Sequence, residues 1–385
     1  MCVGFWTLDH PEWSLVLCAN RDEFLDRPTR PAQWHNFPSK DELSENIARK
    51  DATPEPHSSP PTGSVLSGID VQAGGTWFGI NHSGRVAFIT NITEPHFKPH
   101  KVSRGALVAA YLDPTKQTPQ PKSQDLSGFL DAAVTGPEDP IVDTAGFNLL
   151  LLEPQRSSTN ALDASTRRPT EFSAALLSNS GGETPIRART IRSASKSSVA
   201  PDATSLACEG LSNGIDRSEI DGLGLRDPWK KIPLGEQLLA EVLAQYEQGL
   251  SNARQAQSIA ELEGQLVEDL MNLLGSRAPQ PIITVRDMRD NIFVPASLSI
   301  RSSAKWYGTR LSTVILIRRT TGEVLFVERD RSMLVPRDDA VVAAWRAAGG
   351  RTFDEAMLEQ QATIPWIMDP VESRRTQRVY RFTIP

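Results

Sequence analysis

The sequence predicts an α+β fold whose core is formed by two stacked, mainly antiparallel sheets, with helices on the outside. Strand-like segments come first along the chain, helical patterns lie between, and strand-like segments return near the carboxyl end. Many of the strand-like segments are joined by short turns, which is typical of antiparallel hairpins. Units in which a helix connects two parallel strands are fewer, so a sheet-on-sheet core is the simplest arrangement.

The predicted strands are short runs of aliphatic, β-branched or aromatic residues without a helical period. They cover residues 13–19, 77–80, 85–91, 147–152, 305–318 and 323–329. The turn at residues 81–84 (Asn-His-Ser-Gly) and the pair Thr321-Gly322 join neighbouring strands into hairpins. Residues 147–152 are apolar throughout, which predicts a central strand.

The predicted helices show apolar residues at helical spacing. They cover residues 103–112, 126–134, 235–250 and 259–274. Ser103 is a suitable cap for the first helix, because its hydroxyl can accept a hydrogen bond from a free backbone N–H. In the helix over 235–250, Leu239, Leu243 and Tyr246 lie on one stripe that should face the sheets.

Three stretches of the chain are rich in serine, threonine, proline and charged residues, at about residues 37–62, 156–170 and 180–204. Such segments bury too little apolar surface to offset the entropy lost on ordering. We therefore expect one domain over residues 1–385 with these stretches as insertions. The basic stretch from Arg187 to Lys196 is expected to be a solvated loop, open to phosphorylation, rather than a patch for an anionic partner.

Composition excludes several classes of function. The chain has 385 residues, is 39% hydrophobic and carries a formal net charge of -6, and its Lys and Arg residues form no basic face for nucleic acid. Three cysteines without a CxxC pair predict a reducing compartment. No apolar run reaches the ~18 residues of a membrane span, and no secretory signal is recognisable. We therefore expect a cytoplasmic protein without a transmembrane segment.

Cys2 is the first candidate for chemistry. Removal of Met1 would make Cys2 the N-terminus, so that one residue carries a thiol and a free amine with reference pKa values of ~8.5 and ~7.7–8.0. The amine can take the thiol proton through one water, and a guanidinium such as that of Arg21 would favour the thiolate. The alternative is a small residue at a frayed chain end. The apolar residues 3–6 favour a terminus paired in a sheet.

A polar cluster follows the strand over residues 13–19. If the strand continues, Asn20 and Asp22 face one side of the sheet, and Arg21 and Glu23 face the other. This would place one basic and two acidic groups beside the strand that begins at Cys2. The alternative is a strand end held by salt bridges without a chemical role.

The Asn-Arg-Asp-Glu quartet behind a Met-Cys start resembles the NRDE family, also called the transport and Golgi organization protein 2 family. The matching motifs extend over almost the whole chain: Cys2, residues 20–23, Gly74-Gly75-Thr76-Trp77, Asn81, Gly84, Thr90-Asn91, Ser103-Arg104-Gly105, Phe147-Asn148-Leu149, Leu211-Ser212-Asn213, Pro228-Trp229 and Tyr307-Gly308-Thr309-Arg310. Residues 215–226 depart from the family pattern as a further insertion.

This family is similar in layout to N-terminal-nucleophile hydrolases of the bile-salt hydrolase and penicillin acylase type, which implies a four-layer αββα sandwich. The resemblance implies Cys2 as the nucleophile, its amine as the base, and Asn91 and Asn213 as oxyanion and amine contacts. Those hydrolases place an Arg three residues before an Asp. Here Asn20 and Glu23 have that spacing, whereas Arg21 and Asp22 have the matching chemistry, so both pairs stay open.

Two main functions follow from these expectations. The first is a Cys2-dependent hydrolase of an amide or thioester bond, and the second is a non-catalytic protein that binds or moves heme or an acyl lipid. A trafficking adaptor with protein partners of the secretory pathway is a third. The resemblance links the family to Golgi organisation, secretion, heme and lipid homeostasis, with cytosolic and mitochondrial pools. We expect no required cofactor and no metal site; heme would be cargo, and the six histidines show no paired ligand spacing.

Overall fold

The computed structural model gives the arrangement of most of the chain. It describes residues 2–37, 63–94, 100–113, 125–134, 143–155, 170–179, 181, 184–191, 206–215, 229–252, 256–280, 282, 284, 286–299, 305–352 and 355–385. The predicted insertions at 37–62, 156–170 and 215–226 fall almost entirely outside these ranges.

The first sheet brings the two ends of the chain together. Its strands follow the order β10-β1-β2-β12-β13-β16, and β11 pairs with β12. Their bounds are β1 (Val3–Thr7), β2 (Trp13–Phe24), β10 (Glu209–Leu211), β11 (Ser297–Ser299), β12 (Lys305–Arg318), β13 (Glu323–Asp330) and β16 (Arg378–Thr383). The predicted β12–β13 hairpin is confirmed, and its turn contains Gly322 with a φ of 67°.

The second sheet is an antiparallel meander in chain order. Its strands are β3 (Thr29–His35), β4 (Val65–Asp70), β5 (Phe78–Asn81), β6 (Val86–Asn91), β7 (Phe147–Pro154), β8 (Phe172–Ser178) and β9 (Arg187–Ile191). The predicted β5–β6 hairpin is confirmed, and Gly84 supplies the positive φ of 85° that its turn requires. β7 lies inside the sheet, as its apolar sequence predicts.

The expectation of a loop at Arg187–Lys196 is wrong for its first part. Residues 187–191 form β9, which pairs with β8 at the edge of the second sheet. Four of its five residues are exposed or partly exposed, so this edge strand needs no apolar run. Its polar composition therefore gave no sign of a strand, which is held by backbone hydrogen bonds to β8. Residues 192–196 lie outside the described ranges.

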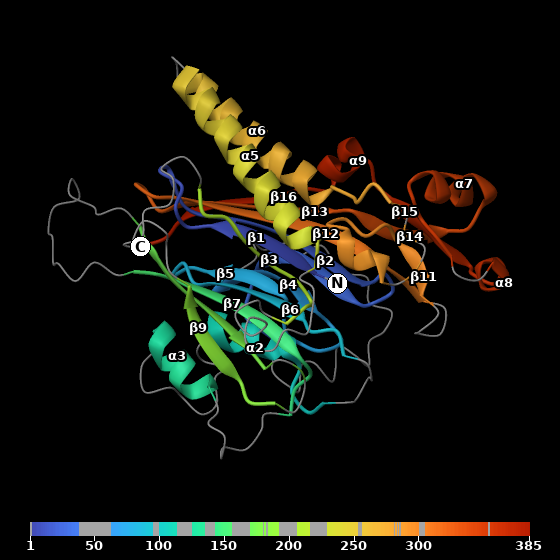
Figure 1. Cartoon of the computed structure of the whole chain (residues 1–385), viewed down its shortest axis with the longest axis horizontal. Helices are drawn as coiled ribbons and strands as arrows, with labels where there is room; N and C mark the ends of the chain where they lie inside the picture. The colour runs from blue at the N-terminus through green and yellow to red at the C-terminus, as the bar shows by residue number, and fades with distance from the viewer. Residues whose placement is uncertain are drawn as a thin grey trace, which may run out of the picture.

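Helices cover both outer faces of the stacked sheets (Figure 1). The pair α5 (Lys231–Asn252) and α6 (Ala256–Leu274) covers the first sheet, while α2 (Arg104–Leu112) and α3 (Leu126–Ala133) cover the second. Ser103 occupies the N-cap position of α2 as predicted, although its side chain makes no capping hydrogen bond. The described elements therefore confirm the expected αββα order of layers.

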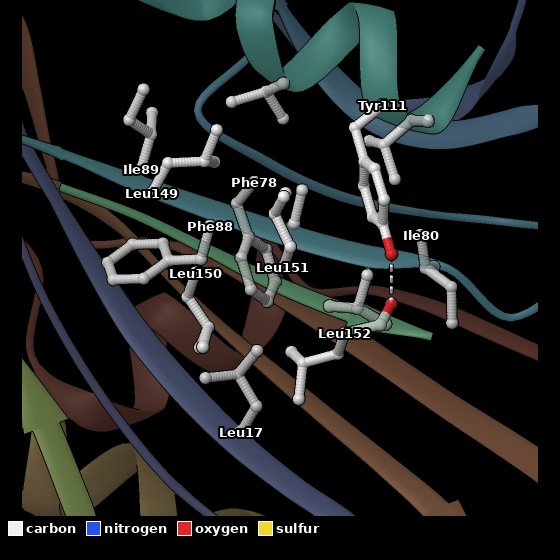
Figure 2. Close-up of a cluster of buried hydrophobic side chains, with 14 of the residues drawn as sticks. Leu17, Phe78, Ile80, Phe88, Ile89, Tyr111, Leu149, Leu150, Leu151 and Leu152 are labelled. Carbon is white, nitrogen blue, oxygen red and sulfur yellow. Dashed lines mark hydrogen bonds between the residues drawn. The ribbon is translucent and has the colours of Figure 1, made fainter. Parts of the chain in front are cut away.

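Two apolar clusters correspond to these layers. The larger one extends from the space between the sheets to α2 and α3 on the far side of the second sheet, and Leu17 of β2 points toward Leu150 of β7 in the space between the sheets (Figure 2). The Tyr111 hydroxyl of α2 donates a hydrogen bond to the Leu152 carbonyl at 3.0 Å, which satisfies a polar group inside this cluster. The second cluster lies between the first sheet and α5 and α6, and contains Val3 and Phe5.

The carboxyl-terminal segment adds a smaller layer beside the first sheet (Figure 1). It contains a two-stranded sheet and short helices: β14 (Ser332–Pro336), α7 (Asp339–Ala347), α8 (Glu355–Glu359), β15 (Thr363–Ile367) and α9 (Pro370–Arg375). Trp345 packs edge-on against Trp306 of β12 and donates a hydrogen bond to the Ala296 carbonyl at 2.6 Å. Sequence patterns gave no expectation for this segment.

The contact between α5 and β1 gives a matched test of the helical layer. Gly235 of α5 lies so close to the Phe5 ring that a methyl group there would overlap the ring, whereas Gly264 of α6 has nothing within 4 Å of that position. We expect Gly235→Ala to lower the free energy of unfolding by ~1–3 kcal/mol because it overpacks the layer. Gly264→Ala should raise it by ~0.5–1 kcal/mol because alanine favours the helix. Urea unfolding measures both, and equal effects would contradict the close packing of α5 on β1.

Candidate functional site

Cys2 lies at the beginning of β1, at the end of the first sheet. The pairing of Val3 with Asn20 places it beside β2, and its side chain is 7% exposed. The thiol donates a weak hydrogen bond to the Asp22 carbonyl at 3.7 Å. The Ser212 hydroxyl donates to the Cys2 carbonyl at 2.7 Å. Cys2, the first residue that the structure describes, is therefore held by hydrogen bonds on two sides rather than frayed.

The polar quartet of β2 is divided between the two faces of the sheet. On the side of α6, the Asn20 amide donates to the Leu274 carbonyl at 2.8 Å and to the Ile292 carbonyl at 3.0 Å. The Asp22 carboxylate accepts from the Thr309 hydroxyl at 2.6 Å on the neighbouring strand. Asn20 thus ties the sheet to the helical layer, and Asp22 combines a buried carboxylate with a carbonyl that contacts Cys2.

Arg21 points to the other face, into the space between the sheets. Its guanidinium lies 3.6 Å from the centre of the Trp77 ring and donates to the Thr29 hydroxyl at 2.8 Å. Asp70 is 3.7 Å away. Burial lowers the pKa of Arg21, while nearby carboxylates and the Cys2 sulfur oppose the shift. Trp77, from the Gly-Gly-Thr-Trp motif, therefore acts as the platform that holds this cation in place.

Two further arginines lie near this end of the molecule and were given no role by the sequence. A register shift between Thr309 and Leu311 puts Arg310 beside Arg21, where it donates to the Arg27 carbonyl at 2.6 Å and to Thr29 at 3.2 Å. Burial lowers the pKa of Arg310 to about 10, and the charge of Arg21 acts in the same direction. Arg104 donates to the Gly146 carbonyl at 3.3 Å and interacts electrostatically with Cys2.

The segment from Ser212 to Gly214 is held against Cys2 by the second sheet. The Asn148 amide donates to the Ser212 carbonyl at 3.0 Å and to the Gly214 carbonyl at 2.6 Å, so it spans Asn213. The Thr90 hydroxyl also donates to the Ser212 carbonyl, at 2.8 Å. Asn148 is fully buried in β7, and its contribution was missed because its neighbours form an apolar strand.

The two predicted asparagines take different positions. Asn213 is 6% exposed, and within the described part of the chain its side-chain oxygen has no hydrogen-bond partner. A buried acceptor without a partner is costly, so it is suited to receive a proton donor from a ligand or from the amine of Cys2. Asn91 is partly buried at the end of β6, one residue after Thr90. The hydrogen bonds of Cys2 to Asp22 and from Ser212 bring Asp22 and the neighbour of Ser212, Asn213, to Cys2. Arg21 lies on the same face of the sheet as Cys2, and Asn91 follows Thr90 at the border of the site.

Lys231 was also missed by sequence reasoning. It is the first residue of α5 and is fully buried, with its ammonium 5.2 Å from the centre of the Trp229 ring. Burial lowers the pKa of Lys231 to about 8, while the negative charges of Asp22 and Cys2 oppose the shift. The predicted start of this helix at residue 235 left Lys231 in a loop.

The state of the Cys2 thiol depends on opposing effects. Burial raises its pKa, and the carboxylates of Asp22 and Glu23 act in the same direction. Arg21, Arg104 and Lys231 all interact favourably with an ionised Cys2. Ionisation therefore requires a base nearby together with these cations.

Neither a metal-ligand cluster nor a membrane-spanning helix is found among the described residues. Within the ranges given above, no group of three or more His, Cys, Asp or Glu side chains is placed to hold a metal ion. Among the described helices, none combines the length and the apolar character needed to cross a bilayer.

Comparisons with known proteins agree on one family. The model of the family described as Transport and Golgi organisation 2 matches residues 1–333. A Transport and Golgi organization 2 homolog of Mus musculus is 27% identical over 341 residues, which cover 86% of this chain and 92% of the relative. The Homo sapiens homolog is 26% identical over 344 residues, with the same shares covered.

Solved structures give weaker similarities. Penicillin V acylase from Agrobacterium tumefaciens has a TM-score of 0.38 and 11% identity, over 84% of this chain and 82% of that chain. The C2A mutant of conjugated bile acid hydrolase from Clostridium perfringens has a TM-score of 0.37 and 8% identity, over 85% and 88%. At these scores we base no conclusion on the two structures.

The clamp made by Asn148 can be tested directly. Asn148→Ala removes one buried and one partly buried hydrogen bond and should lower the free energy of unfolding by ~2–3 kcal/mol. Amide hydrogen exchange in residues 212–214 should accelerate, because this segment loses its tie to β7. Gln155→Ala, which removes an exposed amide that reaches Ser173 at 3.3 Å, is the control and should change stability by less than ~0.5 kcal/mol. An Asn148→Ala protein that behaves like the control would show that the clamp is dispensable.

Proposed function

The chain belongs to the Transport and Golgi organisation 2 family, and from this premise we propose that it is a hydrolase that uses Cys2 to cleave an amide or thioester bond. We place this activity in transport and Golgi organisation, the processes for which the mouse and human relatives are named. The ligand class that fits the proposal is a small acyl compound.

The single observation that supports the proposal most is the position of Cys2. Its thiol lies at a strand end and donates a weak hydrogen bond to the Asp22 carbonyl, and Arg21 lies on the same face of the sheet. Arg21 is held by Trp77 and Thr29, so its charge is fixed rather than mobile. A nucleophilic cysteine needs a fixed positive neighbour of this kind, because only the thiolate attacks a carbonyl carbon.

The proposed reaction begins with removal of Met1, which frees the amine of Cys2. The amine accepts the thiol proton through one water, and the sulfur forms a bond to the carbonyl carbon of the substrate. The bond from this carbon to the substrate nitrogen or sulfur then breaks, and the leaving group takes the proton from the amine. Water hydrolyses the resulting acyl thioester, which releases the carboxylic acid and restores the thiol.

The polar residues around Cys2 have distinct proposed roles. The buried side-chain oxygen of Asn213 would accept a hydrogen bond from the freed amine and hold it beside the sulfur. Asp22 would stabilise the amine once it is protonated. Asn91 would donate from its side-chain amide to the oxygen that becomes negative when the sulfur attacks.

A second function is favoured by one specific observation, the burial of the thiol. Because burial raises the pKa of Cys2, the thiol stays neutral unless a base removes its proton. A neutral, inert thiol fits a protein that binds heme or an acyl lipid as cargo without turnover, where no cofactor is required.

Substitution of Cys2 separates the two functions. With a panel of acyl amides and acyl thioesters, we expect Cys2→Ala to lower turnover by ~10³-fold or more, because the nucleophile is lost. Intact mass should show that the active protein lacks Met1. Cys208→Ala is the matched control, since it removes a half-buried thiol elsewhere and should leave turnover unchanged.

Two results would contradict the proposed hydrolase function. Retention of Met1 in the purified protein, or equal turnover of Cys2→Ala and the unsubstituted chain, would exclude the N-terminal nucleophile. A heme absorption titration in parallel identifies the alternative, because a carrier that does not use the thiol would bind heme equally well in both proteins while neither hydrolyses the panel.

A further inference from the structure

Lys231 occupies a position that is unfavourable for a lysine in two ways. Its side chain is fully buried, and the transfer of an ammonium from water to a protein interior is unfavourable unless charges or hydrogen bonds compensate. It also lies in the first turn of α5, where the positive end of the helix dipole repels a cation. The preceding residue, Lys230, has a side chain that is 84% exposed, so an ordinary surface position is directly adjacent.

The compensation comes from the end of β2. The Lys231 ammonium is attracted by the Asp22 carboxylate, then by the Cys2 sulfur and by Asp290. Asp22 connects the two sides of the sheet. Its carboxylate accepts a hydrogen bond from the Thr309 hydroxyl on the helical side, and its backbone carbonyl accepts a hydrogen bond from the Cys2 thiol. A charge placed near Asp22 from the helical layer is therefore felt at the sulfur.

We propose, on the basis of the Cys2-dependent hydrolysis above, that Lys231 is a positioning residue for the nucleophile. Its buried ammonium balances the Asp22 carboxylate from the helical side of the sheet, so that the sulfur on the other side can carry a negative charge. Without Lys231, the carboxylate charge would act on the sulfur unopposed and would hold the thiol in its protonated form.

Among the described residues, six charged side chains act on Cys2 or on Lys231. They are Arg21, Asp22 and Glu23 on β2, Arg104 on α2, Lys231 on α5, and Asp290 on the short 3-10 helix η4 (Asp287–Asp290). Arg21 and Arg104 also favour the ionised sulfur. Lys231 differs from them because it belongs to α5, the helix that covers the face of the first sheet on which the Asp22 carboxylate lies.

The charge of Lys231 also sets the pH range of its effect. Because burial lowers the pKa of Lys231 to about 8, its ammonium is present at neutral pH and is lost as the pH rises through that value. Its support for the ionised sulfur is therefore complete below that pH and declines above it.

The experiment measures ionisation of Cys2 without any substrate. The rate of alkylation by iodoacetamide is followed between about pH 6 and pH 10, and peptide mapping separates Cys2 from Cys18 and Cys208. Lys231→Met keeps the length of the side chain and removes its charge. We expect alkylation of Cys2 near pH 7 to fall about tenfold, the effect of one pKa unit on the thiolate fraction. Lys231→Arg should retain most of the rate, and Lys230→Met should not change it.

A second substitution distinguishes charge balance from altered packing. In the Lys231→Met background, Asp22→Asn removes the carboxylate that Lys231 balances, so alkylation should recover to near the rate of the unsubstituted protein. Thermal unfolding confirms that each variant is folded. Unchanged alkylation in a folded Lys231→Met protein, or a loss that Asp22→Asn does not reverse, would overturn the proposal. Because no turnover is measured, failure of the hydrolase function would appear separately, in the substrate panel.

Discussion

The structure depends on the pairing of β1 with β2 in the first sheet. Val3 lies opposite Asn20, and this register brings the sulfur of Cys2 to the backbone of Asp22. β10 pairs with the other edge of β1, and the Phe5 ring fills the space beneath α5 at Gly235. A slip of one residue would move Cys2 to the helical face and Val3 to the space between the sheets, so the burial of both faces fixes the position of the thiol.

The same strand end separates two environments with different electrostatics. On the inner face, Arg21 is held by an aromatic ring and a hydroxyl, and Arg310 lies beside it. On the helical face, Asn20 and Asp22 are bound to neighbouring strands and to the segments around α6. Because successive residues of a strand point to opposite sides, the short polar sequence of β2 supplies the Arg21 cation to one layer and the Asp22 carboxylate to the other.

Much of this arrangement follows from periodicity in the sequence. The alternation of β2 and its opposed faces, the hairpins at Gly84 and Gly322, and the apolar stripe of α5 are local patterns that packing reinforces. Lys231 was missed because the helix was predicted to start at residue 235, whereas α5 begins at Lys231; Pro233 lies in its first turn, where proline is tolerated. The position of Arg310 depends on a register shift in β12, and the hydrogen bonds of Asn148 depend on a segment that is distant in sequence. Neither feature can be recognised from a local sequence pattern.

The order of strands in the first sheet has a consequence for biosynthesis. β2 pairs with β12, so the beginning of the chain finds its central partner only when residues near 305–318 have been made. Contacts so distant in sequence form late and slowly, which leaves β2 unpaired on the side of β12 while the ribosome extends the chain. During this interval the amino terminus stays accessible to a peptidase, and the apolar strand segments stay accessible to chaperones. The Ser212 hydroxyl that binds the Cys2 carbonyl is also distant in sequence, so Cys2 is enclosed only after residues near 212 have been made.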